Sequence, residues 1–305
     1  MIVRLIALAL LLATCGCATL PPAPAAPART VEWEQLQAPG LPEHHVTVWL
    51  PPGYDASGGP YPVLYMWDGQ NLFDPAKTQY GKAWMVDRVL TDMVAKGRAK
   101  PHIVVGIWSP VGLDRYRHYL PQPAAAGAAG EVAADVARMA GGPVASAQEL
   151  EWVADVLKPR VDAAFRTRTA ARDTTIIGSS MGGVMACYAI VARPDIFGRA
   201  GCVSAHWPVA DPDLAEKHRT EILATWRTWL ARDLGQPQGR RIWLDHGTAT
   251  LDAYYGPWQD AIAQDLTDLG WIEGRDFTAR TYPGAEHDEI YWNQRLPEML
   301  AWLWR

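Results

Sequence analysis

The sequence has little cysteine and no excess of positive charge. Four of its 305 residues are Cys, and 28 Lys and Arg are outnumbered by 33 Asp and Glu, for a net charge of −5. A chain without a basic excess lacks the attraction that nucleic-acid binding requires, so we expect no nucleic-acid partner. The Cys spacing matches no zinc site, and no internal repeat is visible. Its 49% hydrophobic residues are enough for one large α/β domain or two small ones.

The apolar run at the N-terminus is too short for a comfortable membrane span. It extends from Leu5 to Ala13 after Arg4, and Cys17 follows it in a setting that resembles a bacterial lipoprotein processing site. We expect a lipoprotein-type signal peptide over residues 1–17, with an ordinary cleaved signal peptide as the alternative. The Pro- and Ala-rich residues 18–30 predict an extended tether. The protein is expected to be exported, as a periplasmic or outer-membrane lipoprotein, or secreted if Cys17 is not lipidated.

Short apolar strands and helices alternate through residues 31–305, which we interpret as one domain. After an antiparallel start, this alternation predicts a mostly parallel central sheet with helices on both faces. Strands are expected at 31–36, 46–50, 61–67, 103–108, 174–177, 199–204, 241–245 and 277–282. Helices are expected at 84–94, 148–165, 184–192, 215–234, 255–269 and 290–304. Residues 123–142, rich in Ala, Gly and Pro, are interpreted as a mobile, lid-like insertion with a short helix at 131–139.

The most informative segment is Gly178-Ser179-Ser180-Met181-Gly182. It lies between an expected strand and an expected helix, which is the context of a nucleophile elbow. Small residues two before and two after the Ser allow the tight, strained turn that exposes its hydroxyl. The helix N-terminus beneath the turn adds backbone N–H groups and a positive dipole end. We interpret Ser180 as a nucleophile, against the alternative of a Gly-rich turn with an incidental Ser.

A Ser nucleophile needs a base, because its hydroxyl is weakly nucleophilic at neutral pH. The base should lie late in the chain, so His287, between the last expected strand and the last helix, is the best of the eight His. The acid is expected beyond the strand that ends at Asp245. Asp252 lies farther out in that loop and can reach across to His287, so we favour it over Asp245. Glu286 and Asp288 are the remaining alternatives.

An oxyanion hole needs two N–H donors. The expected pair is the Met181 N–H, directly after the nucleophile, and the Gln70 N–H, in the loop after strand 61–67. Substrate-binding aromatics are expected among Trp84, Trp207 and Tyr254, with core packing as an even alternative for each. His206, which also follows a strand, could line the pocket.

The remaining residues near these loops have less specific interpretations. Arg115 and Arg117 could hold an anionic or phenolic substrate, but solvated loop charges are favoured. Cys187 and Cys202 fall on the helix and the strand after the elbow, where two buried thiols are favoured over a disulfide.

Four motifs together resemble the putative esterase family of α/β-hydrolases, the esterase D-like and enterochelin esterase-like group. They are Asp-Gly-Gln-Asn-Leu-Phe-Asp at 68–74, the elbow at 178–183, Gly247 with Asp252, and residues 284–287 followed by Tyr291-Trp292. The resemblance covers the chain from about Val31 onward and implies an α/β-hydrolase fold. Carried over by position, it implies Ser180 as nucleophile, His287 as base and Asp252 as acid. The stretch 123–142 departs from the family's pattern and leaves the acyl and alcohol pockets undefined.

The residues and the resemblance together predict a serine carboxylesterase that works through an acyl-enzyme and needs no metal or organic cofactor. A siderophore or an acylated carbohydrate is the expected substrate. The alternatives are acyl transfer to an acceptor other than water, peptide hydrolysis, and a non-catalytic surface-anchored binding module. The presence of nucleophile, base and acid candidates disfavours the binding module. Membrane contact is expected only through the lipid anchor, and the sequence indicates no oligomeric state.

Overall fold

The computed structural model describes residues 26–55, 58–78, 80–110 and 112–305. The predicted signal peptide, its Cys17 and most of the predicted tether lie outside the described residues. Within the described ranges, no helix combines the length and the hydropathy needed to cross a membrane.

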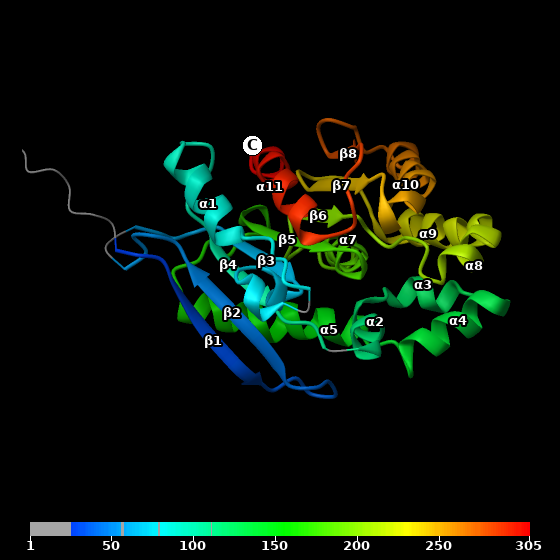
Figure 1. Cartoon of the computed structure of the whole chain (residues 1–305), viewed down its shortest axis with the longest axis horizontal. Helices are drawn as coiled ribbons and strands as arrows, with labels where there is room; N and C mark the ends of the chain where they lie inside the picture. The colour runs from blue at the N-terminus through cyan, green and yellow to red at the C-terminus, as the bar shows by residue number, and fades with distance from the viewer. Residues whose placement is uncertain (1–25, 56–57, 79, 111) are drawn as a thin grey trace, which may run out of the picture.

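The described residues form one central sheet of eight strands (Figure 1). The strands are β1 (Arg29–Leu36), β2 (His44–Leu50), β3 (Val63–Trp67), β4 (Ile103–Ile107), β5 (Thr174–Ser179), β6 (Arg199–Val203), β7 (Arg241–Gly247) and β8 (Phe277–Tyr282). Their order across the sheet is β1-β2-β4-β3-β5-β6-β7-β8. β2 is antiparallel to β1 and β4, and every other neighbouring pair is parallel. This is the α/β-hydrolase fold, which confirms the fold predicted from the sequence.

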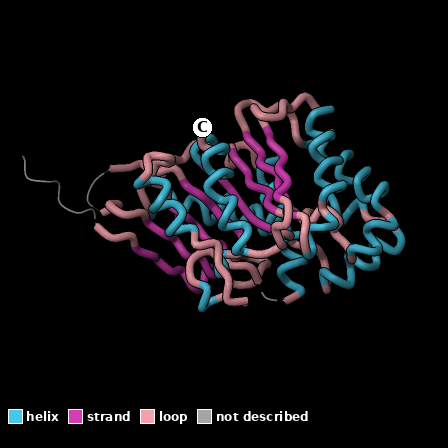
Figure 2. Tube along the Cα trace, turned by 45° about the horizontal axis from the view of Figure 1, so that its top comes forward, coloured by secondary structure: helices cyan, strands magenta, loops and turns pink. Residues whose placement is uncertain are grey.

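Both faces of the sheet are covered by helices (Figure 2). In β3, Val63, Tyr65 and Trp67 join the larger apolar cluster, whereas Leu64 and Met66 point to the opposite face and join the smaller one. Helices α1 and α11 pack on the face of the smaller cluster, and α7 packs on β5 and β6 from the other side. The helices are α1 (Val86–Ala95), α2 (Leu113–Tyr119), α3 (Gln122–Gly127), α4 (Gly130–Ala140), α5 (Ser146–Trp152), α6 (Lys158–Ala164), α7 (Met181–Ala192), α8 (Pro212–Lys217), α9 (Arg219–Asp233), α10 (Gly256–Asp268) and α11 (Glu289–Leu303).

The segment between β4 and β5 holds more helix than the sequence predicted. Helices α2 and α3 were not expected there, and α4 is longer than the predicted helix at 131–139. Helix α3 packs against α9, and α4 packs against α2 and α8, so these helices gather at one end of the molecule (Figure 1). The predicted helix 215–234 is interrupted at His218, which separates α8 from α9.

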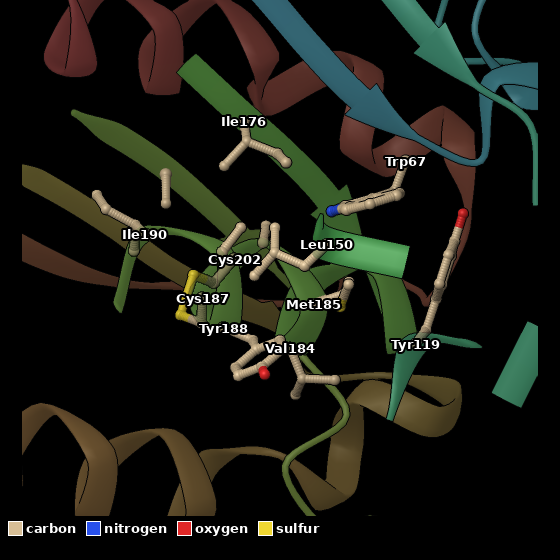
Figure 3. Packing of buried hydrophobic residues seen from close by; sticks show 14 of the residues in the cluster. Trp67, Tyr119, Leu150, Ile176, Val184, Met185, Cys187, Tyr188, Ile190 and Cys202 are labelled. Carbon is tan, nitrogen blue, oxygen red and sulfur yellow. A yellow bond between two sulfur atoms is a disulfide. The ribbon is translucent and has the colours of Figure 1, made fainter. Parts of the chain in front are cut away.

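Cys187 and Cys202 form a disulfide, which corrects the expectation of two buried thiols. Helix α7 packs directly on β6, so the two residues face each other with Cα atoms 5.7 Å apart. Figure 3 shows the bond within the apolar cluster between α7 and the sheet. The sequence did not reveal this pair, because the contact depends on how the helix crosses the strand.

A buried cluster of two His and one Glu joins the helical segment to the sheet. His44 of β2 and His118 of α2 both face Glu149 of α5, with His44 Nε2 and His118 Nδ1 each 2.8 Å from a carboxylate oxygen. His44 Nδ1 also donates to the Pro42 carbonyl at 2.8 Å. Because both acceptors lack a proton, both ring nitrogens of His44 must carry one, which makes the ring an imidazolium. Burial lowers the pKa of His44, but Glu149 outweighs it and raises the pKa above its ordinary value.

We predict that Glu149→Gln destabilises the protein by about 3 kcal/mol, because it leaves the buried His44 cation without its partner. The contribution of His44 is fully present below its unfolded pKa of about 6.5 and is lost as the pH rises through the higher folded pKa. The stability gap between wild type and variant should therefore be largest near about pH 6 and smaller at about pH 9. Urea unfolding at both pH values measures it, with the exposed Glu151→Gln as control. A gap that does not change with pH would contradict the ion pair.

Candidate active site

Ser180 occupies the sharp turn between β5 and α7. Its φ of 59° and ψ of −123° lie in a region that L side chains rarely adopt. The turn is held by the Ser180 N–H, which donates to the Val203 carbonyl at 3.0 Å. A Cβ on Gly178 would overlap the Gly182 carbonyl, and a Cβ on Gly182 would lie 3.0 Å from Asp68 Oδ2. Glycine at these two positions therefore permits the strained turn that presents the Ser180 hydroxyl.

His287 and Asp252 meet at the same edge of the sheet. His287 Nδ1 lies 2.5 Å from Asp252 Oδ1. The second carboxylate oxygen accepts from the Gly247 N–H at 2.5 Å and from the Ser204 hydroxyl at 2.6 Å. Burial raises the pKa of Asp252, but hydrogen bonds from His287, Ser204 and Gly247 outweigh burial and hold the pKa below its ordinary value. An ionised Asp252 keeps the proton of His287 on Nδ1 and leaves Nε2 free to act as a base.

Asp245, the alternative acid, lies behind Asp252 in a buried polar network. Its Oδ2 accepts from Trp243 Nε1 at 2.6 Å, and its Oδ1 lies 3.5 Å from Arg295 Nη2. The Arg295 guanidinium is buried, donates to Ser204 Oγ at 2.7 Å and lies 3.7 Å from Asp252 Oδ2. Burial raises the pKa of Asp245, although Arg295 opposes that rise. One buried cation thus stands between two buried carboxylates and fixes the carboxylate that faces His287.

Tyr255 and His206 form a hydrogen-bonded chain that ends at the Ser180 hydroxyl. The Tyr255 hydroxyl lies 2.7 Å from His206 Nδ1 and also hydrogen-bonds the Ser180 side chain. Burial, assisted by the charge of His287, lowers the pKa of His206 to about 4, so its ring is neutral. The ring also hydrogen-bonds the Ala210 carbonyl, which can only accept.

The number of protons available to Ser180, Tyr255 and His206 determines which group donates in each hydrogen bond. The proton of the neutral His206 ring goes to Ala210, so His206 Nδ1 accepts the Tyr255 hydroxyl proton. Tyr255 then has only lone pairs left for Ser180, and the Ser180 hydroxyl donates to it. No described hydrogen bond joins Ser180 to His287, whose ring lies edge-on to Tyr255 with centroids 5.6 Å apart. In this arrangement the Ser180 hydroxyl is directed to Tyr255 rather than to His287.

The two predicted oxyanion donors follow neighbouring strands of the sheet. Gln70 lies in the 3₁₀ turn after β3, and Met181 begins α7 after β5. No described residue accepts a hydrogen bond from either backbone N–H. The Gln70 side chain is fixed by Ser109, whose hydroxyl accepts from Nε2 at 2.7 Å and whose N–H donates to Oε1 at 3.1 Å. Both N–H groups therefore lack an acceptor among the described residues, as unoccupied oxyanion donors would.

Helix α2 holds the loop that carries Gln70. Arg115 binds Asp68 with two hydrogen bonds, Nε to Oδ1 at 2.7 Å and Nη2 to Oδ2 at 2.8 Å. The Tyr119 hydroxyl accepts from the Asp68 N–H at 3.3 Å. Arg115 is therefore an ion-paired helical residue, which corrects its interpretation as a solvated loop charge. Arg117 points elsewhere and donates to the Pro143 carbonyl at 3.0 Å.

The three predicted pocket aromatics occupy different environments. Trp84 is buried and stacks on Trp292 with ring centroids 5.5 Å apart. Trp207 is also buried and meets Trp226 edge-on at 5.2 Å. These two side chains pack in the core, the alternative that the sequence left open. Tyr254 is half exposed in the turn that carries Asp252.

Tyr255, Ser204 and Arg295 are the site residues that sequence reasoning missed. Tyr255 lay at the start of an expected helix, and Ser204 at the end of an expected strand. Ser204 directly after β6, and Tyr255 in the connection between β7 and α10 that also carries Asp252, were usable signals, because residues beyond the strand C-termini converge on one edge of a parallel sheet. Arg295 offered no comparable signal, since it lies in the middle of α11, directly after Asn293 and Gln294.

Comparisons with known proteins give a family and a shared fold. A family model described as "Putative esterase" matches residues 42–303. The uncharacterised protein YbbA of Bacillus subtilis is 23% identical over 263 residues, which cover 85% of this chain and 91% of YbbA. A solved ferulic acid esterase matches with a TM-score of 0.64 and 19% identity, over 90% of this chain and 98% of its own.

The enterobactin esterase FES of Shigella flexneri, solved in the presence of 2,3-dihydroxy-N-benzoyl-glycine, matches with a TM-score of 0.61 and 20% identity. The match covers 92% of this chain and 61% of FES, so this chain spans about three fifths of that protein. At such identities the likeness to both solved structures shows a shared fold.

Replacing Tyr255 by Phe removes the acceptor that competes for the Ser180 proton. We expect kcat/KM for p-nitrophenyl acetate to stay at the wild-type value or to rise by up to about fivefold, because a net hydrogen bond is worth about 1 kcal/mol. Steady-state kinetics measures this ratio. A tenfold or larger loss would mean that the hydroxyl assists the reaction, which contradicts the direction of the chain.

Proposed function

Because this chain belongs to the putative esterase family and is a carboxylic ester hydrolase, we propose that it works through an acyl-enzyme on Ser180. His287 is the general base and Asp252 the acid that orients it. The observation that carries the proposal is the 2.5 Å contact between His287 Nδ1 and the buried Asp252, beside a Ser180 held in a strained turn. Tyr255 supports their proximity, since it hydrogen-bonds Ser180 and packs edge-on against the His287 ring.

In the first half-reaction the Ser180 hydroxyl turns from Tyr255 to His287. His287 Nε2 takes the proton as Ser180 Oγ attacks the ester carbonyl, and Asp252 stabilises the imidazolium that forms. The N–H groups of Gln70 and Met181 bind the carbonyl oxygen as it gains charge. His287 then gives the proton to the departing alkoxide, which leaves as the alcohol while the acyl group stays on Ser180.

In the second half-reaction water replaces the alcohol. His287 takes a proton from the water as its oxygen attacks the acyl carbon, and the same N–H groups stabilise the second tetrahedral intermediate. When this intermediate collapses, Ser180 Oγ regains a proton from His287 and the carboxylic acid is released. Each group thus returns to its starting state without a cofactor.

We propose a siderophore or an acylated carbohydrate as the substrate. Esterases of ferulic acid and of enterobactin share this fold, and ferulic acid and the 2,3-dihydroxy-N-benzoyl-glycine present with the second enzyme both carry an aromatic ring. The half-exposed Tyr254, in the same turn as Asp252, offers such a ligand a flat apolar surface at the mouth of the site.

We also propose that the protein is exported and lipid-anchored at Cys17. The Cys187–Cys202 disulfide supports export, because structural disulfides persist mainly in oxidising compartments.

Ser180→Ala should abolish hydrolysis of p-nitrophenyl acetate, because no other group can form the acyl-enzyme. The same variant should lose labelling by a fluorophosphonate probe, read by gel fluorescence. Circular dichroism checks that the variant is folded. Labelling that persists on another residue of the variant would contradict the assignment.

Asp252→Asn and Asp245→Asn form a matched pair, since both replace a buried carboxylate, one in β7 and one in the turn that follows it. Asp252→Asn should lower kcat by about 10³–10⁴-fold, because the amide cannot hold His287 with its proton on Nδ1. Asp245→Asn should cost about tenfold or less, since Asp245 reaches Asp252 only indirectly, through Arg295 and the Ser204 N–H. Steady-state kinetics on both variants decides between them, and a larger loss for Asp245→Asn would overturn the choice of acid.

A further inference from the structure

A cationic pocket lies at the edge of the sheet opposite Ser180. It occupies the N-terminal ends of β4, β5 and β6, whereas Ser180 follows the C-terminal end of β5. Its volume is about 440 Å³. Six basic side chains line it: Arg98, Lys100, Arg168, Arg172, Arg199 and Arg305. Asp173 is the one acidic side chain among its described lining residues.

The positive charge of this pocket is largely uncompensated. Asp173 lies 3.5 Å from Arg168 and 3.6 Å from Arg172. Arg98 and Lys100 are exposed and form no ion pair with any described residue. Arg199 is partly buried, and its Nε donates to the Leu303 carbonyl at 2.6 Å. An Arg bonded to carbonyls keeps its full charge, so the pocket retains a strong positive potential.

The positive charges of the pocket and its surroundings lower the pKa values of two groups in it. His102, stacked on Trp304 at 3.6 Å, has its pKa lowered to about 4 by burial and by the charges of Arg199 and Arg168. The pKa of Arg199 is itself lowered, first by burial and then by the neighbouring Arg241. An anion in the pocket would relieve the repulsion among these cations.

An apolar groove adjoins the cationic pocket. It has a volume of about 240 Å³ and shares His102 with the pocket. Its walls include Trp49, Leu90 and Val94, with Pro51 and Pro101. The described chain also begins at this edge, where the Gly53 N–H donates to the Ala26 carbonyl at 2.8 Å. Cationic pocket and apolar groove together fit a molecule with an anionic group at one end and a hydrocarbon part at the other.

We propose that this pocket binds the phosphate of an anionic lipid headgroup. The adjoining groove, which would hold the hydrocarbon part of the lipid, favours this ligand over free phosphate. Guanidinium groups bind phosphate through paired hydrogen bonds, and several converge here on one concave surface. The site is separate from the catalytic edge, so lipid can be bound while Ser180 faces away from it.

The test compares two double variants of the full chain that change net charge equally. Arg98→Glu with Lys100→Glu reverses two exposed charges of the pocket. Lys77→Glu with Arg88→Glu reverses two exposed charges outside it, which form no ion pair with described residues. Each protein is sedimented with phosphatidylcholine vesicles, with and without phosphatidylglycerol, and its p-nitrophenyl acetate activity is measured. A second arm follows the melting temperature of each protein in inorganic phosphate.

We expect wild type and the Lys77/Arg88 variant to bind the vesicles more tightly when phosphatidylglycerol is present. The Arg98/Lys100 variant should lose about tenfold or more of that binding and keep wild-type esterase activity. Equal losses of vesicle binding in the two variants would overturn the site. So would vesicle binding that does not depend on phosphatidylglycerol, if phosphate also leaves the melting temperatures unchanged. Suppose that phosphate raises the melting temperature of wild type and of the Lys77/Arg88 variant but not that of the Arg98/Lys100 variant, and that none of the proteins binds the vesicles. That result would keep the phosphate site and would overturn the lipid as its ligand.

Discussion

The site depends on the left-handed backbone of Ser180. A non-glycine residue with a φ of 59° is strained, and it persists only where the surroundings determine it fully. Here the strain is held between β5 and α7, two elements whose packing is among the most extensive in the fold. The turn leaves Ser180 partly exposed and the Met181 N–H without an acceptor among the described residues, next to the loops that follow the neighbouring strands. A relaxed backbone at this point would present neither group.

Two cations, the partly exposed Arg115 and the buried Arg295, support the groups proposed to react. Arg115 binds Asp68 and so holds the loop that carries Gln70, while Arg295 stands behind Asp252 and Ser204. Buried charges cost free energy unless they are paired and hydrogen-bonded, so ion pairs of this kind contribute geometry more than stability. The strained Ser180 turn holds the proposed nucleophile, and the two arginines hold residues that contact its proposed partners.

The sequence revealed the fold and the residues proposed to react, because both leave local signals. Strand and helix periodicity, the glycines around Ser180, and the late His287 are each visible within a few residues. The residues that hold the site in place could not be predicted from the sequence, because their roles depend on tertiary contacts. Helix α2 lies in a polar segment without a clear period, so Arg115 looked solvated. The Cys187–Cys202 bond and the Arg295 network require knowing how α7 and α11 cross the sheet.

The central claim is that the ester's acyl group is carried by Ser180. Rapid acid quenching during turnover of p-nitrophenyl acetate, followed by peptide mass spectrometry, locates that group directly. The account predicts an acetyl group on the peptide that contains Ser180, at the serine itself. Acetyl found on Tyr255, on a lysine or on a histidine instead, during a full burst of product, would contradict the account.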